Sequence, residues 1–526
     1  MDPILLGEIL AVGLFASIVF ILMLGYPVAF TLPGVAVLFA VLGWSLGVFD
    51  LSYFNSLPLR YWGILTNDVL IAVPLFVVMG VLLERSKIAE DLLITMGQLF
   101  GPVRGGLGIS AIIVATLLAA STGIVGASVV TMGLISLPSM LAAGYDKRMA
   151  SGLICASGTP GQIIPPSTVL VVLAVVLQSA YSQAQMAKGN FQPETLSVGD
   201  LFAGAFLPGL LLAGLYILWV GGRAFFLPHT APALVLDAAQ KASLPRRVVI
   251  ALVPPLLLIV AVLGSIIAGV ATPTESASVG AVGALVLMLV RLLSEWYSRS
   301  LSPERVERFN FWFWLALLAL LAIVDLVAGA LGLLTLAVVL LVGLLAWTLL
   351  LRGTRAQCIR SLSETGTSSL VITGMVFVIF FGASVFSVVF SRLGGENLVH
   401  EFLNAMPGGA DGALFVVMAI IFVLGFFLDP FEIIFIVVTL AAPVLLKMDV
   451  DPVWLAILIG INLQTSYLTP PFGFSLFYLR GVAPPEVTTG DIYLGIAPFV
   501  AIQVLCIFLV WYFPALATWL PKVLYG

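Results

Sequence analysis

The chain has 526 residues, of which 61% are hydrophobic and only 9% are charged. Because soluble proteins carry roughly 25% charged residues, this composition excludes a soluble enzyme or binding protein and predicts an all-α polytopic membrane protein in a lipid bilayer. The net charge of −4 says little by itself, and we expect no nucleic-acid partner. Three cysteines lie far apart in mostly apolar stretches, so they predict neither a disulfide framework nor a metal site.

Apolar runs long enough to cross a bilayer recur along the whole chain. The first lacks a preceding basic region and a small-residue cleavage site, so we expect a spanning helix and not a removed signal peptide. About twelve runs of this kind occur, at 4–24, 27–49, 68–86, 149–180, 200–222, 248–268, 275–291, 311–327, 330–351, 367–391, 453–479 and 492–515.

Two longer runs, 107–142 and 412–446, each have a polar, turn-like centre. These centres read ASTGIVGAS and FLDPFE, and neither contains a lysine or an arginine. They are too short and too apolar for solvated loops, and polar backbone at membrane depth is tolerated only inside protein or beside a water-filled cavity. We therefore predict two re-entrant hairpins.

Basic residues give the orientation of the chain. With the N-terminus outside, the outer side keeps five of the 22 lysines and arginines and the inner side holds the other 17. This distribution satisfies the positive-inside rule. Counting each hairpin as two full crossings would leave the distribution unchanged, so charge supports the order of the spans but not the depth of the hairpins. The five outer residues are Arg60, Lys188, Arg392, Lys447 and Lys522.

An internal repeat links the two halves. TPGQIIPPSTVL at 159–170 matches TSYLTPPFGFSL at 465–476, since each has a hydroxyl-rich run, a Pro-Pro pair and then renewed helix. Each follows a 35-residue hairpin and precedes a match between VGDLFAGAFLPG at 198–209 and TGDIYLGIAPF at 489–499. In the predicted orientation, the two broken helices cross the membrane in opposite directions, so the repeats are inverted. Paired interrupted helices are the best sequence pointer to a transporter's binding site.

The helix breaks offer oxygen atoms to a ligand. Proline lacks an N–H and clashes with the carbonyl four residues back, so a Pro-Pro pair frees carbonyl oxygens that are costly to leave unpaired in hydrocarbon. Carbonyls and hydroxyls suit a small hard cation, and the half-helix N-termini that follow suit a carboxylate substrate. The candidate cation-binding residues are Ser121, Thr122, Gly123, Gly126, Ser128, Ser157, Gly158, Thr159, Gly161, Asp429, Gln464, Thr465, Ser466 and Thr469.

Several acidic residues have a structural interpretation beside the functional one. Asp429 either binds a cation or caps a hairpin turn, because FLDPFE is also a good turn sequence. TPTE at 272–275 is a capping box, which favours a structural role for Glu275. Asp200 and Asp491 are expected to cap the helices that they begin. A membrane enzyme would need a nucleophile with a positioned base or a catalytic carboxylate pair, and neither is evident, so we expect no enzymatic activity.

These motifs carry a family resemblance. AVPLFVVMGVLLERS at 72–86, SGTPGQIIPPS, GVATPTESASVGAV at 269–282, FLDPFEIIF and YLTPPFGFSLF resemble the large membrane subunit of a tripartite ATP-independent periplasmic (TRAP) transporter, from about 1 to 291 and from 352 to 515. The resemblance implies an elevator mechanism driven by inward sodium flow across the bacterial inner membrane. It also implies a small four-helix membrane subunit and a periplasmic binding protein that delivers an organic acid.

Carried over to this chain, the resemblance implies one sodium site at the first hairpin tip with residues 157–161 and another at the second tip with residues 465–469. Substrate would lie between them, and the implied substrate-binding residues are Pro165, Pro166, Ser167, Pro470, Pro471 and Phe472. The chain departs from the family at the first tip, where many members carry an aspartate, and at Ser475, where many have asparagine. Either departure could alter substrate preference or ion coordination.

The expected organisation follows from these assignments. Scaffold helices occupy 1–66 and 223–291, the first repeat 67–222 and the second 352–526. Residues 292–351 are expected to be an insertion with two extra spans, which could dock the small subunit or partly replace it. The alternative function is a stand-alone sodium-coupled di- or tricarboxylate carrier with the same inverted hairpins, which would need no binding protein.

Overall fold

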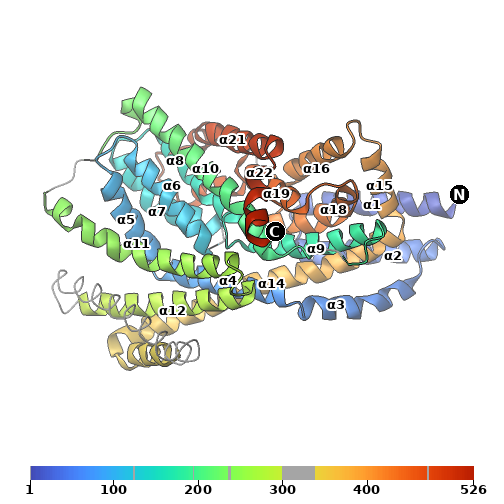
Figure 1. Ribbon diagram of the computed structural model, residues 1–526, viewed down its shortest axis with the longest axis horizontal. Coiled ribbons are helices and arrows are strands. Elements are labelled where there is room, and N and C mark those ends of the chain that lie inside the picture. Colours follow the sequence, from blue (N-terminus) through green and yellow to red (C-terminus); the bar gives the residue numbers. More distant parts are fainter. Residues whose placement is uncertain (1, 123–124, 193–194, 235–237, 299–337, 471–472) are drawn as a thin grey trace.

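The computed structural model describes residues 2–122, 125–192, 195–234, 238–298, 338–470 and 473–526. Every regular element in these ranges is a helix, which confirms the all-α prediction (Figure 1). Nine helices of the described part are long and apolar enough to cross a membrane, or ten if a bent pair of helices is counted as one span. The chain is therefore a multi-pass membrane protein.

The first half begins with six helices that precede the first hairpin in the chain. These are α1 (Pro3–Met23), α2 (Val28–Ser45), η1 (Leu51–Ser56), α3 (Leu57–Leu65), α4 (Asp68–Arg85) and α5 (Ile88–Phe100). The first hairpin and the elements after it are α6 (Gly106–Thr122), α7 (Val125–Ala142), α8 (Lys147–Gly158), η2 (Thr159–Gln162), α9 (Thr168–Ala187), α10 (Val198–Phe226) and η3 (Pro228–Thr230).

Long helices then lead to the second half, namely α11 (Ala238–Ile267), α12 (Pro273–Ser298) and α14 (Arg352–Arg392). The second hairpin and its successors are α15 (Gly395–Asn404), α16 (Ala410–Leu424), α17 (Pro430–Ile433), the π-helical turn η4 (Ile434–Val438), α18 (Thr439–Lys447), α19 (Pro452–Leu468), α20 (Phe474–Val482), α21 (Thr489–Tyr512) and α22 (Ala515–Tyr525). In Figure 1 the first hairpin lies at the left and the second at the right, with α10 and α19 between them.

Matching caps begin matching helices in the two halves. The Asp146 carboxylate accepts a hydrogen bond from the Met149 N–H (2.9 Å) at the start of α8, and Asp451 accepts one from the Trp454 N–H (2.9 Å) at the start of α19. Capping boxes start α10 and α21, where Asp200 pairs with Ser197 and Asp491 pairs with Thr488. The structure confirms the predicted capping role of Asp200 and Asp491.

Glycines bring the broken helix of each half against the other half. Gly495 of α21 lies so close to α8 that a Cβ atom there would stand 2.0 Å from the Arg148 carbonyl oxygen. A Cβ on Gly204 of α10 would stand 2.6 Å from the Val453 side chain of α19. Gly204 and Gly495 each follow the capping-box aspartate by four residues, and Arg148 and Val453 each follow the capping aspartate by two. The contact is therefore reciprocal, as a two-fold relation between the halves requires.

A second reciprocal contact joins the hairpins to the restarted half-helices. The second arm of the first hairpin, α7, packs against α20, and the second arm of the second hairpin, α18, packs against α9. Gly133 of α7 faces Leu479 and Val482 of α20, where a Cβ would lie within 2.9 Å of both side chains. Each break is thus covered by elements from both halves, which supports the internal repeat read from the sequence.

The described helices differ from the predicted spans in some places. The runs 149–180 and 453–479, which were predicted to be broken helices, are each divided between two helices. Part of the expected insertion, including the run 311–327, lies outside the described residues. A helix at 338–350 falls within the predicted run 330–351. The apolar runs did not predict α3, α5, α15 and α22, because these short helices mix polar and apolar residues.

Candidate ion and substrate site

The first break is a buried, irregular segment between α8 and α9. After α8 ends at Gly158, one 3₁₀ turn covers Thr159–Gln162, and α9 begins only at Thr168. Residues 157–167 are all buried. The Ser167 hydroxyl donates to the Gln162 carbonyl oxygen (2.6 Å) and accepts from the Leu170 N–H (3.3 Å). Ser167, an expected substrate residue, therefore caps the N-terminus of α9 in this structure.

The second break interrupts α19 in a similar way. Thr469 follows the last residue of α19 and is extended, and its hydroxyl donates to the Thr465 carbonyl oxygen (2.7 Å). The Gly473 N–H donates to the Thr469 carbonyl oxygen (3.1 Å), and α20 begins at the next residue. The Ser475 hydroxyl donates to the carbonyl oxygen of Tyr467 (3.2 Å) across the break. Pro471 and Phe472, two expected substrate residues, lie outside the described residues.

The candidate hydroxyls at the two breaks share one hydrogen-bonding pattern. Each donates its hydrogen to a carbonyl oxygen three or four residues earlier in the chain. A hydroxyl that donates in this way keeps oxygen lone pairs for another partner. The residues are therefore chemically able to ligate a cation without giving up these bonds. They are Ser157, Thr159, Thr465, Ser466 and Thr469.

Three buried glutamines add amide oxygens at the breaks. Gln503 of α21 is fully buried, and its Nε2 donates to the Thr159 hydroxyl oxygen (3.1 Å). Within the described residues, the Oε1 atoms of Gln162, Gln464 and Gln503 have no hydrogen-bond partner, and neither does Nε2 of Gln464. Buried polar atoms without a partner are rare and call for a physical explanation. Amide oxygens are ligands for hard cations, so these atoms fit the predicted ion chemistry.

Sequence reasoning found only one of these glutamines. Gln464 was a candidate because it adjoins the second break, whereas Gln162 and Gln503 were missed. Gln503 lies in α21 and comes 344 residues after Thr159 in the chain. A single amide in the apolar run IAPFVAIQVLCIFLVWY was the available signal, because an uncompensated amide in an apolar helix is costly.

The first hairpin tip lies against both breaks. A Cβ on Gly158, in the first break, would stand 2.4 Å from Val129 of α7. A Cβ on Gly126 would stand 2.9 Å from the ring of Tyr478 in α20. Ser128 is buried beside these contacts, Ser121 and Thr122 end α6, and Gly123 lies outside the described residues. The structure therefore brings the described part of this tip, 125–129, to the region that the sequence predicted.

The second hairpin tip lies against α19 just before the second break. A Cβ on Gly425, at the end of α16, would stand 2.0 Å from the hydroxyl oxygen of Ser466. Asp429 begins α17 with a capping box, in which its carboxylate accepts from the Phe431 N–H (3.0 Å) and its own N–H donates to Glu432 (3.0 Å). The structure shows that Asp429 caps α17, and its predicted cation-binding role stays a prediction.

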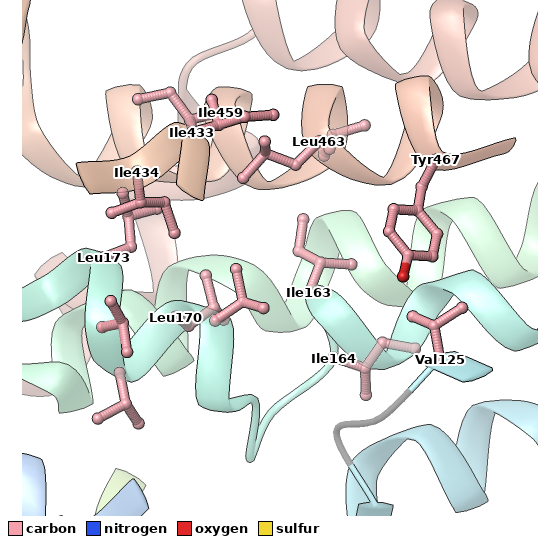
Figure 2. Packing of buried hydrophobic residues seen from close by; sticks show 14 of the residues in the cluster. Val125, Ile163, Ile164, Leu170, Leu173, Ile433, Ile434, Ile459, Leu463 and Tyr467 are labelled. Carbon is pink, nitrogen blue, oxygen red and sulfur yellow. The ribbon is translucent and has the colours of Figure 1, made fainter. Parts of the chain in front are cut away.

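Apolar side chains fill the contact between the first break and α19. Ile163 of the first break lies within van der Waals distance of Gly460 in α19, 3.7 Å from the Cβ position of that glycine. Figure 2 shows Ile163 and Ile164 between α19, which carries Leu463 and Tyr467, and the start of α7 at Val125. Tyr467 stacks on Phe474 with ring centroids 4.9 Å apart. The oxygen-bearing segments are thus enclosed by an apolar shell.

An all-helical membrane protein with two interrupted helices, each beside a hairpin, has the architecture of a secondary transporter. The family model for the DctM component of the tripartite ATP-independent periplasmic transporter matches residues 15–341 and 313–516. The chain therefore belongs to this family, the large permease proteins of TRAP transporters.

Individual relatives span almost the whole chain. The C4-dicarboxylate TRAP transporter large permease protein DctM of Vibrio cholerae is 28% identical over 98% of both chains. The ectoine/5-hydroxyectoine large permease protein UehC of Ruegeria pomeroyi is 23% identical over 98% of this chain and 100% of its own length. Among solved structures, the YdaH transporter of Alcanivorax borkumensis has a TM-score of 0.53 at 15% identity, covering 89% of this chain and 88% of its own. That likeness concerns the fold alone.

Proposed function

We propose that this permease couples the inward flow of sodium to the uptake of an organic acid, delivered by a periplasmic binding protein, across the bacterial inner membrane. The observation that carries the proposal is the set of buried glutamine oxygens without partners, Gln162, Gln464 and Gln503, at two breaks already rich in hydroxyls. Sodium is the transported coupling ion, and no organic cofactor is expected.

The substrate class follows from chemistry and from the relatives. The N-termini of α9 and α20 begin at the two breaks, and the partial positive charge of a helix N-terminus favours an anion such as a carboxylate. The Vibrio cholerae relative is named for C4-dicarboxylates, and a 24%-identical relative from Haemophilus influenzae, covering 92% of this chain and 66% of its own length, is named for sialic acid. An organic acid is the substrate class that fits both lines of reasoning.

Threonine substitutions test the sodium sites. We expect Thr159→Ala and Thr469→Ala each to raise the sodium concentration needed for half-maximal uptake by about tenfold to a hundredfold, since the loss of one ligand to a charged group costs about 1.5–3 kcal/mol. Thr518→Ala in α22 is the matched control, because its hydroxyl donates to a carbonyl oxygen four residues earlier (3.2 Å) and the residue belongs to neither break. Uptake in proteoliposomes measures the effect, and unchanged sodium activation in both variants contradicts the assignment.

The tripartite mechanism is distinguished from the stand-alone carrier by reconstitution. We expect uptake to require the permease, the small four-helix membrane subunit and the binding protein together. Proteoliposomes that contain the permease alone should show no sodium-dependent uptake until the other two are added. Uptake at full rate without any binding protein would instead establish the stand-alone sodium-coupled carrier.

A further inference from the structure

A polar cavity of about 260 Å³ lies between η1, α3 and the C-terminal end of α14. Its walls carry two arginines, Arg60 of α3 and Arg392 of α14, together with the hydroxyl-bearing residues Ser52, Ser56 and Ser391. The cavity is far along the chain from both helix breaks, and nothing in the proposed transport cycle uses it. Two guanidinium groups in one small cavity give it a positive charge.

Neither arginine is neutralised by a carboxylate among the described residues. The salt bridges of the described part of the chain include neither Arg60 nor Arg392. The Arg392 guanidinium lies over the ring of Tyr53, 4.7 Å from its centroid, which holds the group at the cavity wall. The nearby Asp50 carboxylate accepts a hydrogen bond from the Ser52 N–H (2.8 Å) and caps η1.

The helix beside the cavity has exposed apolar side chains. Leu59, Trp62 and Leu65 of α3 are 77%, 65% and 55% exposed. The segment 51–65 bends by 54° from α4, and α3 lies along the lower edge of the molecule in Figure 1. A short helix that leaves a spanning helix at an angle, with tryptophan and leucine exposed, is typical of a helix in the membrane interface.

The topology places the cavity at one face of the membrane. Gly43 near the end of α2 and Gly7 near the start of α1 both adjoin Leu393, the residue after Arg392. The start of α1, the end of α2 and the end of α14 therefore lie together. On the orientation given by the positive-inside rule this is the outer face, where Arg60 and Arg392 are two of only five basic residues. The presence of Arg60 and Arg392 in one cavity is an exception to the general depletion of positive charge on the outer face.

We propose that the cavity of Arg60 and Arg392 binds the phosphate group of a membrane phospholipid, with preference for a lipid of net negative charge. Arginine pairs with phosphate through two parallel N–H···O bonds, and the serine hydroxyls supply further donors. The acyl chains of the bound lipid lie along the exposed apolar residues of α3. A soluble acidic partner would match only the charge, whereas a lipid also contacts the bilayer-facing side chains of Leu59, Trp62 and Leu65, so the lipid is the occupant that fits both halves of the site.

Lipid binding to the purified full-length permease tests the proposal. We expect native mass spectrometry to show phosphatidylglycerol retained by the delipidated wild type at concentrations at least tenfold below those needed for phosphatidylcholine. The double substitution Arg60→Gln/Arg392→Gln should weaken phosphatidylglycerol retention at least tenfold. Arg355→Gln is the matched control, since Arg355 is an exposed arginine near the opposite end of α14. It should bind phosphatidylglycerol as the wild type does.

Further measurements keep the outcome decisive. Arg60→Gln alone is the second variant if the double substitution fails to fold, because it leaves the Arg392 contact with Tyr53 intact. Equal retention of phosphatidylglycerol by wild type and the arginine variants overturns the proposal. Thermal stabilisation by inorganic phosphate equal to that by phosphatidylglycerol would assign the cavity to a soluble anion. Loss of binding-protein association with lipid retention unchanged would make it a protein-docking surface.

Discussion

At the scale of single residues, the two breaks are built from amides and hydroxyls whose hydrogen-bonding capacity exceeds what the protein satisfies. The serine and threonine hydroxyls donate hydrogen bonds to nearby backbone carbonyl oxygens. The side-chain oxygens of the three glutamines, in contrast, have no hydrogen-bond partner among the described residues. A buried polar atom without a partner costs about 1–3 kcal/mol. Such a cost is typical of functional sites, where a ligand supplies the missing contact.

Gln464 offers a test of this trade between stability and function. We expect Gln464→Leu to leave the thermal stability of the sodium-free protein unchanged or to raise it, because neither amide atom has a partner among the described residues. The same substitution should abolish the dependence of uptake on sodium. Thermal unfolding with and without sodium, together with uptake in proteoliposomes, checks both statements. A large loss of stability without sodium would show that Gln464 has a structural role.

Residue chemistry was predictable where it is local. Proline pairs, capping boxes and the turn at Asp429 affect only residues within four or five positions along the chain. For this reason the sequence predicted the breaks and the caps of α10 and α21. The contact of Gln503 with Thr159 depends on helix packing across 344 residues, which no local pattern encodes. The helix α3 was missed because a helix of nine residues lacks the long apolar run of a spanning segment.

At the scale of elements, the halves are joined by close helix contacts that only glycine permits. Gly495 lies against the backbone of α8, and Gly204 lies against Val453 of α19 and the Ala517 carbonyl oxygen of α22. Small residues at helix interfaces allow backbones to approach closely, and packing drives helix association within lipid. The sequence match between the two aspartate-to-glycine segments thus reflects equivalent packing and not only similar composition.

Alanine substitutions measure these contacts. We expect Gly495→Ala and Gly204→Ala each to destabilise the protein by about 1–3 kcal/mol, since a methyl group has no space at either interface. Gly214→Ala in α10 is the matched control, because no atom lies within 4 Å of its Cβ position. It should be neutral or stabilising by up to about 1 kcal/mol. Thermal unfolding in detergent measures all three, and equal stability of the three variants would refute close packing.

At the scale of the whole molecule, the elevator mechanism that the family resemblance implies would require the two repeats to slide past the scaffold helices. One aromatic pair lies at this expected boundary. Tyr61 of α3, in the expected scaffold, and Phe381 of α14, in the expected second repeat, have ring centroids 4.8 Å apart. A ring contact of this kind carries no fixed hydrogen bond and suits surfaces that move along each other. The domain boundaries drawn from the sequence stay a prediction until such movement is measured.

Cross-linking across this boundary tests the movement. We expect a cysteine pair at Tyr61 and Phe381, once oxidised, to stop uptake, and a reductant to restore it. The matched control is a pair at Phe380 and Phe435, whose rings lie 4.2 Å apart on α14 and η4, both within the expected second repeat. Its cross-link should leave uptake intact. Full uptake by the cross-linked Tyr61–Phe381 variant would argue against sliding between these elements.

The reciprocal glycine contacts also have a consequence for biogenesis. The surface of α8 around Arg148 is covered by α21, whose contacting residue Asp491 is synthesised 343 residues later. At about 5–20 residues per second, the ribosome needs about 20–70 seconds to supply it. During that interval the first broken helix has already entered the membrane without its partner. Neither half reaches its final packing alone, so the protein matures only when its last long helix arrives.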